Sequence, residues 1–271
     1  MKLDAYIERI GYAGDLRPDL ATLNGLMDAH IRAVPFENTD IYAVRPVRYG
    51  IDAAFEQIVI HRQGGWCYEM NGVFGWALSE IGFEVTRLAA GVRRAMLGDG
   101  ALGNHLCLMV TLDQPYLVDV GFGSTQNYAI PIIEGVTNHP PMQFAMKPVE
   151  DGLWRLHEGG LKSLVSYDFA PVAGDEALLA KRHSEQVTDP DSIFRKTLVA
   201  KIRRDKAHYV LRGRKLETLW PGRSDSHLIK DPEELVSTLS EVFGLDVPYM
   251  AHLWPAICER HLQMHPQAEN S

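Results

Sequence analysis

A cysteine stands between two aromatic residues in the segment HRQGGWCYEMNG, residues 61–72. Apolar residues recur at helical spacing from Trp66 to Ile81, so Cys67 is predicted to lie in the first turn of a helix that Gly82 ends. Free N–H groups and the helix dipole favour a thiolate there, and the paired glycines before it permit close approach of a substrate. The segment therefore predicts a reactive cysteine nucleophile.

A thiol nucleophile needs a base and a group that orients the base. His105 opens one predicted strand, and Asp119 ends the next among apolar residues, where an unpaired carboxylate would be costly. A turn at residues 113–115 would place His105 opposite Gly123, four residues from Asp119, unless a bulge or a shifted register intervenes. The residues predict a triad of Cys67, His105 and Asp119, but their spacing leaves the pairing open.

The other two cysteines, Cys107 and Cys258, fall in an apolar strand and on an apolar helix face, which predicts structural roles. Three cysteines without a CxxC pair fit neither a disulfide framework nor a zinc site. No metal site is predicted.

The chain has 271 residues and a formal net charge of −8, which disfavours nucleic-acid binding. No apolar run is long enough for a membrane span, and the acids near the N-terminus argue against a signal peptide, so we expect a cytoplasmic protein. The segment 201–215 is basic, which predicts either a solvated hairpin face or contacts to an anionic ligand such as a phosphorylated cofactor.

The elements that must position these residues follow three patterns along the chain. Apolar stripes at helical spacing, such as Leu20, Leu23, Met27 and Ile31, predict a helical region over residues 1–82. Short alternating runs separated by turn residues predict an antiparallel sheet or small barrel over 83–190, although 175–190 is polar and ambiguous. Residues 191–271 mix strands with two closing helices, one starting at Asp231–Pro232 and one interrupted at Pro255.

Three separated segments, VPFENTDI, QGGWCYEMN and LVDVGFG, resemble in this order the signature segments of the arylamine N-acetyltransferases. The resemblance runs through most of the chain and is densest between residues 5 and 125. It implies an α+β fold with an N-terminal helical bundle, a central antiparallel β-barrel and a C-terminal α/β lid around a papain-like or transglutaminase-like core. It also implies the roles of Cys67 as nucleophile, His105 as base and Asp119 as its orienting residue.

The resemblance further implies acetyl transfer from acetyl-CoA, as co-substrate rather than bound cofactor, to arylamines, hydrazines or N-hydroxyarylamines through an acetyl-cysteine. A hydrolase or an amide-forming acyltransferase with the same triad is the alternative. Contacts to CoA are expected from the loop residues Gly121, Gly123, Ser124 and Thr125. The acceptor pocket is expected to involve Phe36 and Phe122, with Trp66 and Tyr68 as further candidates. We expect a monomer or homodimer, with neither nucleic acid nor membrane as partner.

Two positions depart from the family pattern. Gln63 stands where arginine is common before the glycine pair, and Ser124 stands where a glycine is often found. Both concern the surroundings of the triad and leave its three residues unchanged. Glu37 and Asn38 are candidates to pair with Arg9 or Arg62 beneath the cysteine.

Overall fold

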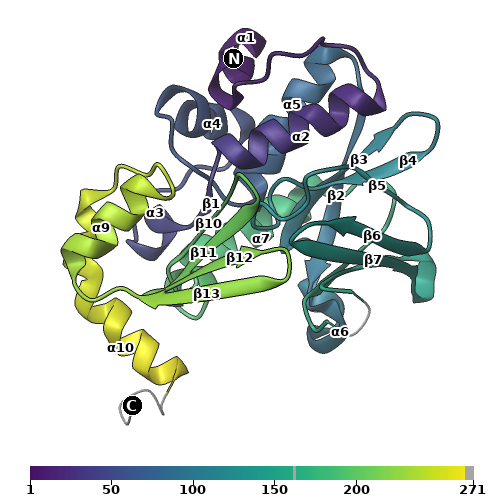
Figure 1. Cartoon of the computed structure of the whole chain (residues 1–271). Helices are drawn as coiled ribbons and strands as arrows, with labels where there is room; N and C mark the ends of the chain where they lie inside the picture. Colours follow the sequence, from purple (N-terminus) through teal and green to yellow (C-terminus); the bar gives the residue numbers. More distant parts are fainter. Residues whose placement is uncertain (161–162, 266–271) are drawn as a thin grey trace.

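The computed structural model describes residues 1–160 and 163–265. Figure 1 shows helices from the N-terminal third packed above two sheets, with the last two helices beside the second sheet. This order of helices, antiparallel strands and a mixed C-terminal region agrees with the expected α+β fold. The boundaries proposed at residues 82/83 and 190/191 remain predictions.

The first part is helical, and its apolar stripes face a shared core. Leu23, Met27 and Ile31 are fully buried in this core, whereas Leu20, expected on the same stripe, is exposed. Asp19 caps the second helix by accepting a hydrogen bond from the Thr22 N–H at 2.8 Å. The helices are α1 (Leu3–Ile10), α2 (Leu20–Ala33), α3 (Thr39–Tyr42), α4 (Ile51–Phe55), which continues into a π-helical turn at Glu56–Ile60, and α5 (Cys67–Ile81).

An eight-stranded antiparallel sheet follows, in the order β5-β4-β3-β2-β9-β8-β7-β6. Its inner side is closed by an apolar cluster that includes Leu88, Phe144 and Tyr167. The strands are β2 (Glu84–Val92), β3 (His105–Thr111), β4 (Pro115–Val118), β5 (Ile130–Pro131), β6 (Gly135–His139), β7 (Met142–Pro148), β8 (Trp154–Glu158) and β9 (Ser166–Phe169), with the short helix α6 (Arg94–Leu97) after β2.

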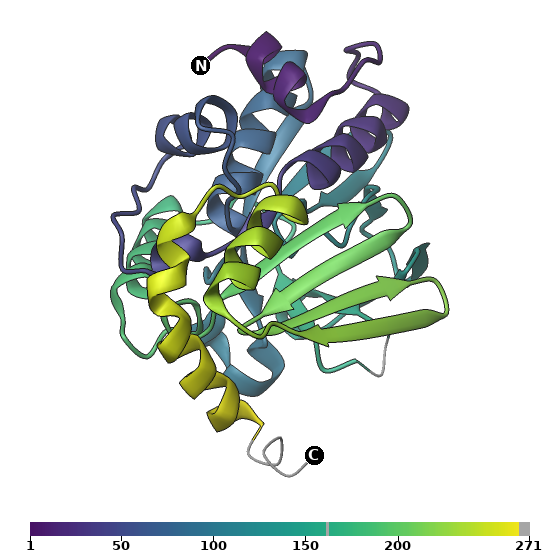
Figure 2. The same cartoon turned by 60° about the vertical axis from the view of Figure 1, so that its left-hand side comes forward.

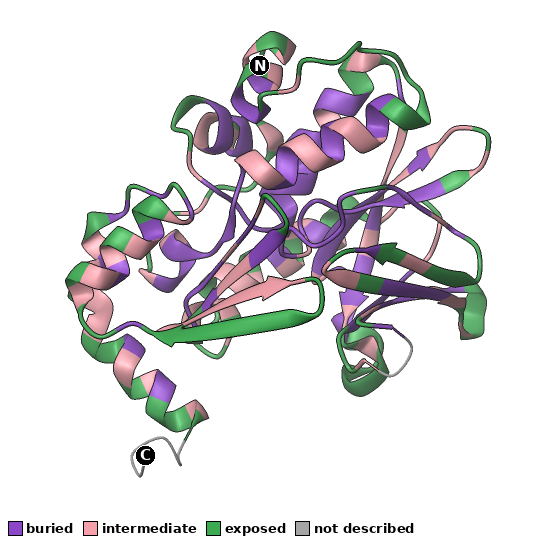
Figure 3. Cartoon of the chain, in the orientation of Figure 1, coloured by how far each residue is buried: buried purple, intermediate pink, exposed green. Residues whose placement is uncertain are grey.

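The second sheet has five strands in the order β1-β10-β11-β12-β13, and its first strand comes from the N-terminal third of the chain. Figure 2 shows the two closing helices lying across one face of this sheet. Figure 3 shows β13 exposed along its length, as expected of an edge strand. The strands are β1 (Phe36–Glu37), β10 (Val199–Arg204), β11 (Ala207–Arg212), β12 (Lys215–Trp220) and β13 (Arg223–Leu228), and the helices are α9 (Pro232–Glu241) and α10 (Trp254–Met264).

The structure resolves one region that the sequence left ambiguous and corrects one expectation about a helix. The polar region 175–190 forms α7 (Glu176–Thr188), which Asp175 caps through the Ala177 and Leu178 N–H groups, and α8 (Ile193–Lys196) follows it. Pro255 does not interrupt a helix but lies in the first turn of α10, where its missing N–H has no partner to lose. The preceding segment, Pro248–Leu253, is a 3₁₀ helix. Asp231 caps α9 as predicted.

None of the described helices combines the length and the apolar character needed to cross a bilayer.

Candidate active site

Cys67 is the first residue of α5, as the sequence predicts, and only 3% of its surface is exposed. The backbone just before this helix is packed too tightly for a side chain, because a Cβ on Gly64 would lie 2.4 Å from the Pro35 carbonyl oxygen. The Gly65 N–H donates to that same oxygen, and the Glu37 N–H donates to the Gly65 carbonyl. The helix start is thereby fixed against β1.

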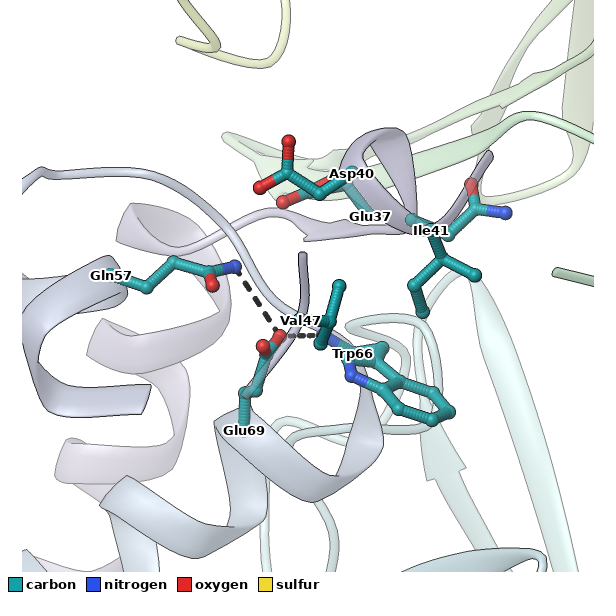
Figure 4. Close-up of a pocket in the computed structure, with 8 residues that line it drawn as sticks. Glu37, Asp40, Ile41, Val47, Gln57, Trp66 and Glu69 are labelled. Carbon is teal, nitrogen blue, oxygen red and sulfur yellow. Dashed lines mark hydrogen bonds between the residues drawn. The ribbon is translucent and has the colours of Figure 1, made fainter. Parts of the chain in front are cut away.

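The Glu69 carboxyl caps the start of α5 by accepting a hydrogen bond from the Trp66 N–H at 3.1 Å. Figure 4 shows Glu69 near Gln57, which also donates to it, with Glu37 on the far side of a small cavity. Burial raises the pKa of Glu69 to about 8, and Glu37 adds to the rise; burial also raises the pKa of Glu37 to about 7. Two buried carboxyls close together retain protons near neutral pH.

The support network beneath the cysteine differs from the proposed pairing of Glu37 and Asn38 with an arginine. Glu37 accepts hydrogen bonds from the Thr39 N–H and hydroxyl, and the Asn38 amide donates to the Phe194 and Thr197 carbonyls. Arg9 instead donates to four backbone carbonyls, those of Ala33, Ile58, Arg62 and Gln63. Backbone oxygens of the segment before the cysteine satisfy this guanidinium, so it needs no carboxylate partner.

The imidazole Nε2 of His105 lies 2.7 Å from Oδ2 of Asp119, and both side chains are buried. This contact arises from a register that differs from the one expected. Thr111 pairs with Pro115 and Leu108 with Val118, so the turn spans residues 112–114. Continuing this register places His105 opposite Gly121, two residues from Asp119 instead of four, which is a diagonal pair on one face of the sheet.

Asn71 is a further residue of this network that the sequence reasoning missed. Its side-chain amide donates to Oδ1 of Asp119 at 2.8 Å and to the Leu106 carbonyl, and its oxygen accepts from the Val120 N–H. Asn71 lies one turn after Cys67 on α5, so the same helix that presents the thiol also holds the carboxylate. The i, i+4 spacing of the two residues was the available signal.

Electrostatics favour a charged imidazole at this site. Burial opposes the charge, but the Asp119 carboxylate, together with Cys67, outweighs it and raises the pKa of His105 to about 10. Since Nε2 faces Asp119, Nδ1 is the nitrogen left for the thiol. The imidazole is thus placed to exchange a proton with the thiol of Cys67.

Cys67 and His105 open into a cavity of about 600 Å³. Of the predicted contact residues, Phe36, Gly121, Phe122 and Gly123 line it. The remaining described lining residues are Val92, Arg93, Met96, Leu97, Asn104, Leu164, Val165, Gln186, Ile193, Phe194, Lys201 and Arg212. The Phe122 ring packs edge-on against the imidazole of His105, with centroids 5.3 Å apart. The wall is therefore mostly apolar, with polar groups at a few positions.

Four predicted residues are outside the described lining of this cavity. Trp66 and Tyr68 instead pack with His183, with ring centroids 5.0 and 5.3 Å from it. Ser124 and Thr125 are fully buried. Ser124 has φ of 60°, the left-handed region that glycine adopts most easily, which fits the glycine that the family resemblance leads one to expect there.

The basic segment 201–215 divides between the two roles considered for it. Lys201 and Arg212 line the cavity. Arg203 is buried and donates to the carbonyls of Thr125, His139 and Pro140, so its role is to join the two sheets. Arg214 donates to the Ile229 carbonyl. Among the described residues, no group of three or more histidine, cysteine or acidic side chains is placed to hold a metal ion.

Gly121 has no room for a side chain. A Cβ there would lie 2.6 Å from the Asn71 amide nitrogen and 2.7 Å from Cα of Cys67, which is backbone and cannot rotate away. Gly121→Ala should lower the free energy of unfolding by about 1–3 kcal/mol and slow alkylation of Cys67, because the helix start must move. Urea unfolding and iodoacetamide labelling measure both effects. The control is Gly135→Ala, where no atom lies within 4 Å of the added carbon; equal effects at both positions would contradict the crowding argument.

The fold and the site around Cys67 indicate an enzyme with a cysteine nucleophile, and the sequence comparison identifies its family. A sequence model of the N-acetyltransferase family matches residues 19–252, most of the chain. The class is thus that of acyltransferases that move an acetyl group to nitrogen.

Relatives and solved structures narrow this class. The arylamine N-acetyltransferase of Mycolicibacterium smegmatis is 33% identical over 262 residues, covering 93% of this chain and 94% of that protein. The structure of the Mycobacterium marinum arylamine N-acetyltransferase has a TM-score of 0.86 at 30% identity, covering 95% of this chain and 99% of that one. The same enzyme solved in complex with CoA has a TM-score of 0.85, with 96% and 98% covered. The chain belongs to the arylamine N-acetyltransferase family.

Proposed function

We propose that the protein transfers an acetyl group from acetyl-CoA to an arylamine, a hydrazine or an N-hydroxyarylamine through an acetyl-cysteine at Cys67. The observation that carries this proposal is the 2.7 Å contact of His105 with Asp119 beside a thiol at a helix start. The M. marinum relative solved in complex with CoA supports acetyl-CoA as the donor. A reducing cytoplasm suits a site that depends on a free thiol.

In the first half-reaction, the Cys67 thiolate attacks the thioester carbonyl of acetyl-CoA. A new C–S bond forms at Cys67, the bond to the CoA sulfur breaks, and the departing CoA thiolate takes a proton from the His105 imidazolium. Unpaired N–H groups at the start of α5 are suitably placed to stabilise the oxyanion.

In the second half-reaction, the acceptor nitrogen attacks the acetyl carbonyl. His105 takes the proton that the nitrogen loses, and the Cys67 thiolate leaves as the new amide forms. Asp119 holds the imidazole in the orientation that both steps need. The apolar walls at Phe36 and Phe122 suit a flat aromatic acceptor.

We also propose that the loop Gly121–Thr125 contributes to CoA binding, as the family pattern implies. Gly121 and Gly123 face the cavity, and Gly123 has φ of 73°, so their backbone groups are close to any occupant. Ser124 and Thr125 would act from beneath this surface by holding the loop, since the Thr125 hydroxyl donates to the Phe122 carbonyl at 3.0 Å.

Acetyl labelling of the intact protein tests the mechanism. Acetyl-CoA without acceptor should add one acetyl group, and peptide mapping should place it on Cys67. Cys67→Ala should abolish both labelling and transfer, whereas Cys107→Ala, at a buried cysteine away from the cavity, should retain both. An acetyl group elsewhere would refute the proposal. Loss of acetyl to water at a rate that ignores added arylamine would favour the hydrolase alternative.

A further inference from the structure

Lys201 is a cation on the cavity wall near the nucleophile. It lies on β10 directly opposite Phe36 of β1, and its Nζ is 5.8 Å from the centre of the Phe36 ring. A Cβ on Gly123 would lie 2.5 Å from that nitrogen, so the amine rests against the Gly123 backbone. The side chain is partly buried. An ammonium group is thus held in an otherwise apolar part of the wall.

Among the described residues, the ammonium of Lys201 forms no direct ion pair or hydrogen bond. Within residues 1–160 and 163–265, its amine donates no hydrogen bond and has no carboxylate oxygen within 4.0 Å. Glu158 acts on it only from a distance: burial lowers the pKa of Lys201, and the Glu158 charge partly restores it. Apart from the Cys67–His105 pair, the charged residues that line the described cavity are Arg93, Lys201 and Arg212, all of them cationic. A ligand with negative charge matches this wall.

The position of Lys201 decides which part of a ligand carries that charge. Gly121 abuts Cys67 and Gly123 abuts Lys201, and two residues span at most about 7 Å. Cys67 and Lys201 therefore lie against neighbouring residues of one wall, within reach of the two ends of a small aromatic acceptor. The phosphates of CoA cannot occupy this spot while the thioester is at Cys67, because the whole pantetheine arm separates them. Arg93 and Arg212, which are exposed, are better placed for phosphates.

We propose that Lys201 is a specificity-determining residue that selects acceptors carrying a carboxylate across the ring from the reacting amine. Such an acceptor places its nitrogen at the acetyl-cysteine and its anion at Nζ, while Phe36 and Phe122 flank the ring. The inference rests on the proposed function, since it assigns one end of the same cavity to the acceptor.

A matched pair of acceptors tests it. With p-nitrophenyl acetate as donor, which removes CoA from the assay, kcat/KM is measured for 4-aminobenzoate and for its methyl ester. Lys201→Met should lower the ratio of kcat/KM for 4-aminobenzoate to kcat/KM for the ester by about tenfold or more, since a charge-assisted hydrogen bond is lost. The value of kcat/KM for the ester should stay within about twofold of the parent's. Lys201→Gln repeats the test with a polar side chain. Arg212→Met should leave the ratio unchanged.

Each alternative outcome overturns the inference in a recognisable way. Equal losses for both acceptors would make Lys201 merely structural. A loss seen only with acetyl-CoA as donor would assign Lys201 to CoA. Acetylation of Cys67 by p-nitrophenyl acetate, followed by mass spectrometry, separates the two proposals. A labelled enzyme with an unchanged ratio refutes the role of Lys201 alone, whereas an unlabelled Cys67 refutes the proposed mechanism.

Discussion

Asp119→Asn should lower kcat/KM for acetyl transfer by about three to four orders of magnitude while the protein stays folded. The asparagine oxygen can still accept the hydrogen bonds that Asn71 and the Gly121 N–H give to Oδ1. Its NH₂ group then faces Nε2 of His105 in place of the carboxylate oxygen. Nε2 must become the acceptor, the proton moves to Nδ1, and the imidazole presents a proton to the thiol where a base is needed.

The exposed Asp113, in the turn between the same two strands, provides the matched control, and Asp113→Asn should keep full activity. Stopped-flow acetylation of Cys67 and the thermal midpoint should be measured for both variants. Asp119→Asn with near-normal acetylation would show that the carboxylate does not orient the base. A large fall in the thermal midpoint would show that its main role is structural.

The protein should lose stability steeply as pH falls below about 6.5, because four buried histidines remain neutral in the fold. Burial lowers the pKa of His30 and His208 to about 3, and that of His139 and His183 to about 4. Below pH 6.5 these histidines are protonated in the unfolded chain but neutral in the folded protein. Each one therefore lowers the free energy of unfolding by about 1.4 kcal/mol per pH unit. Urea unfolding at pH 7 and pH 5 measures the sum.

Three groups with raised pKa values also affect how the stability of the protein depends on pH. Glu37 and Glu69 take up protons in the fold before they do in the unfolded chain, so they recover stability as pH falls toward 4.5 and offset part of the histidine effect. His105 contributes stability that is complete below 6.5 and is lost as pH rises through about 10. The acid-side loss is therefore the histidine effect reduced by the two carboxyls, and His105 adds a separate loss at high pH.

A single substitution isolates the acid effect. His30 lies beside Tyr6, whose hydroxyl is 2.7 Å from Nδ1, and His30→Gln keeps a polar partner there without the titration. This variant should lose about 1.4 kcal/mol less per pH unit than the parent between pH 6.5 and 4.5. The exposed His252 is the control, since His252→Gln should follow the parent. Parallel curves for His30→Gln and the parent would contradict the assignment.

Local patterns predicted the start of α5 because each signal acts within one turn of the helix. The apolar spacing, the glycine pair and the terminal Gly82 all lie within 19 residues of one another, from Gly64 to Gly82. The contact of His105 with Asp119 was less accessible, because it depends on where the intervening turn begins. Moving that turn by one residue shifts the pairing by two, and the turn-forming residues Asp113, Gln114 and Pro115 permit either choice.

Other features could not be predicted because they depend on distant pairing. Helix α7 has only two buried residues, Leu179 and His183, so its apolar stripe is too sparse to distinguish it from a loop. Lys201 reaches the cavity only because β10 pairs with β1, 165 residues earlier at Phe36. Nothing in the spacing of basic residues between 201 and 215 separates Lys201, on the cavity wall, from Arg203, between the sheets.

The pairing of β1 with β10 also has a consequence for biosynthesis. The cavity walls extend from Phe36 to Arg212, so the cavity cannot close until Arg212 has been synthesised. At the usual rate of translation, the thiol of Cys67 precedes that strand by about ten seconds or more. During this interval the nascent chain carries its nucleophile without the sheet that later covers it. Until its synthesis is complete, the chain therefore depends on reducing surroundings to keep Cys67 unmodified.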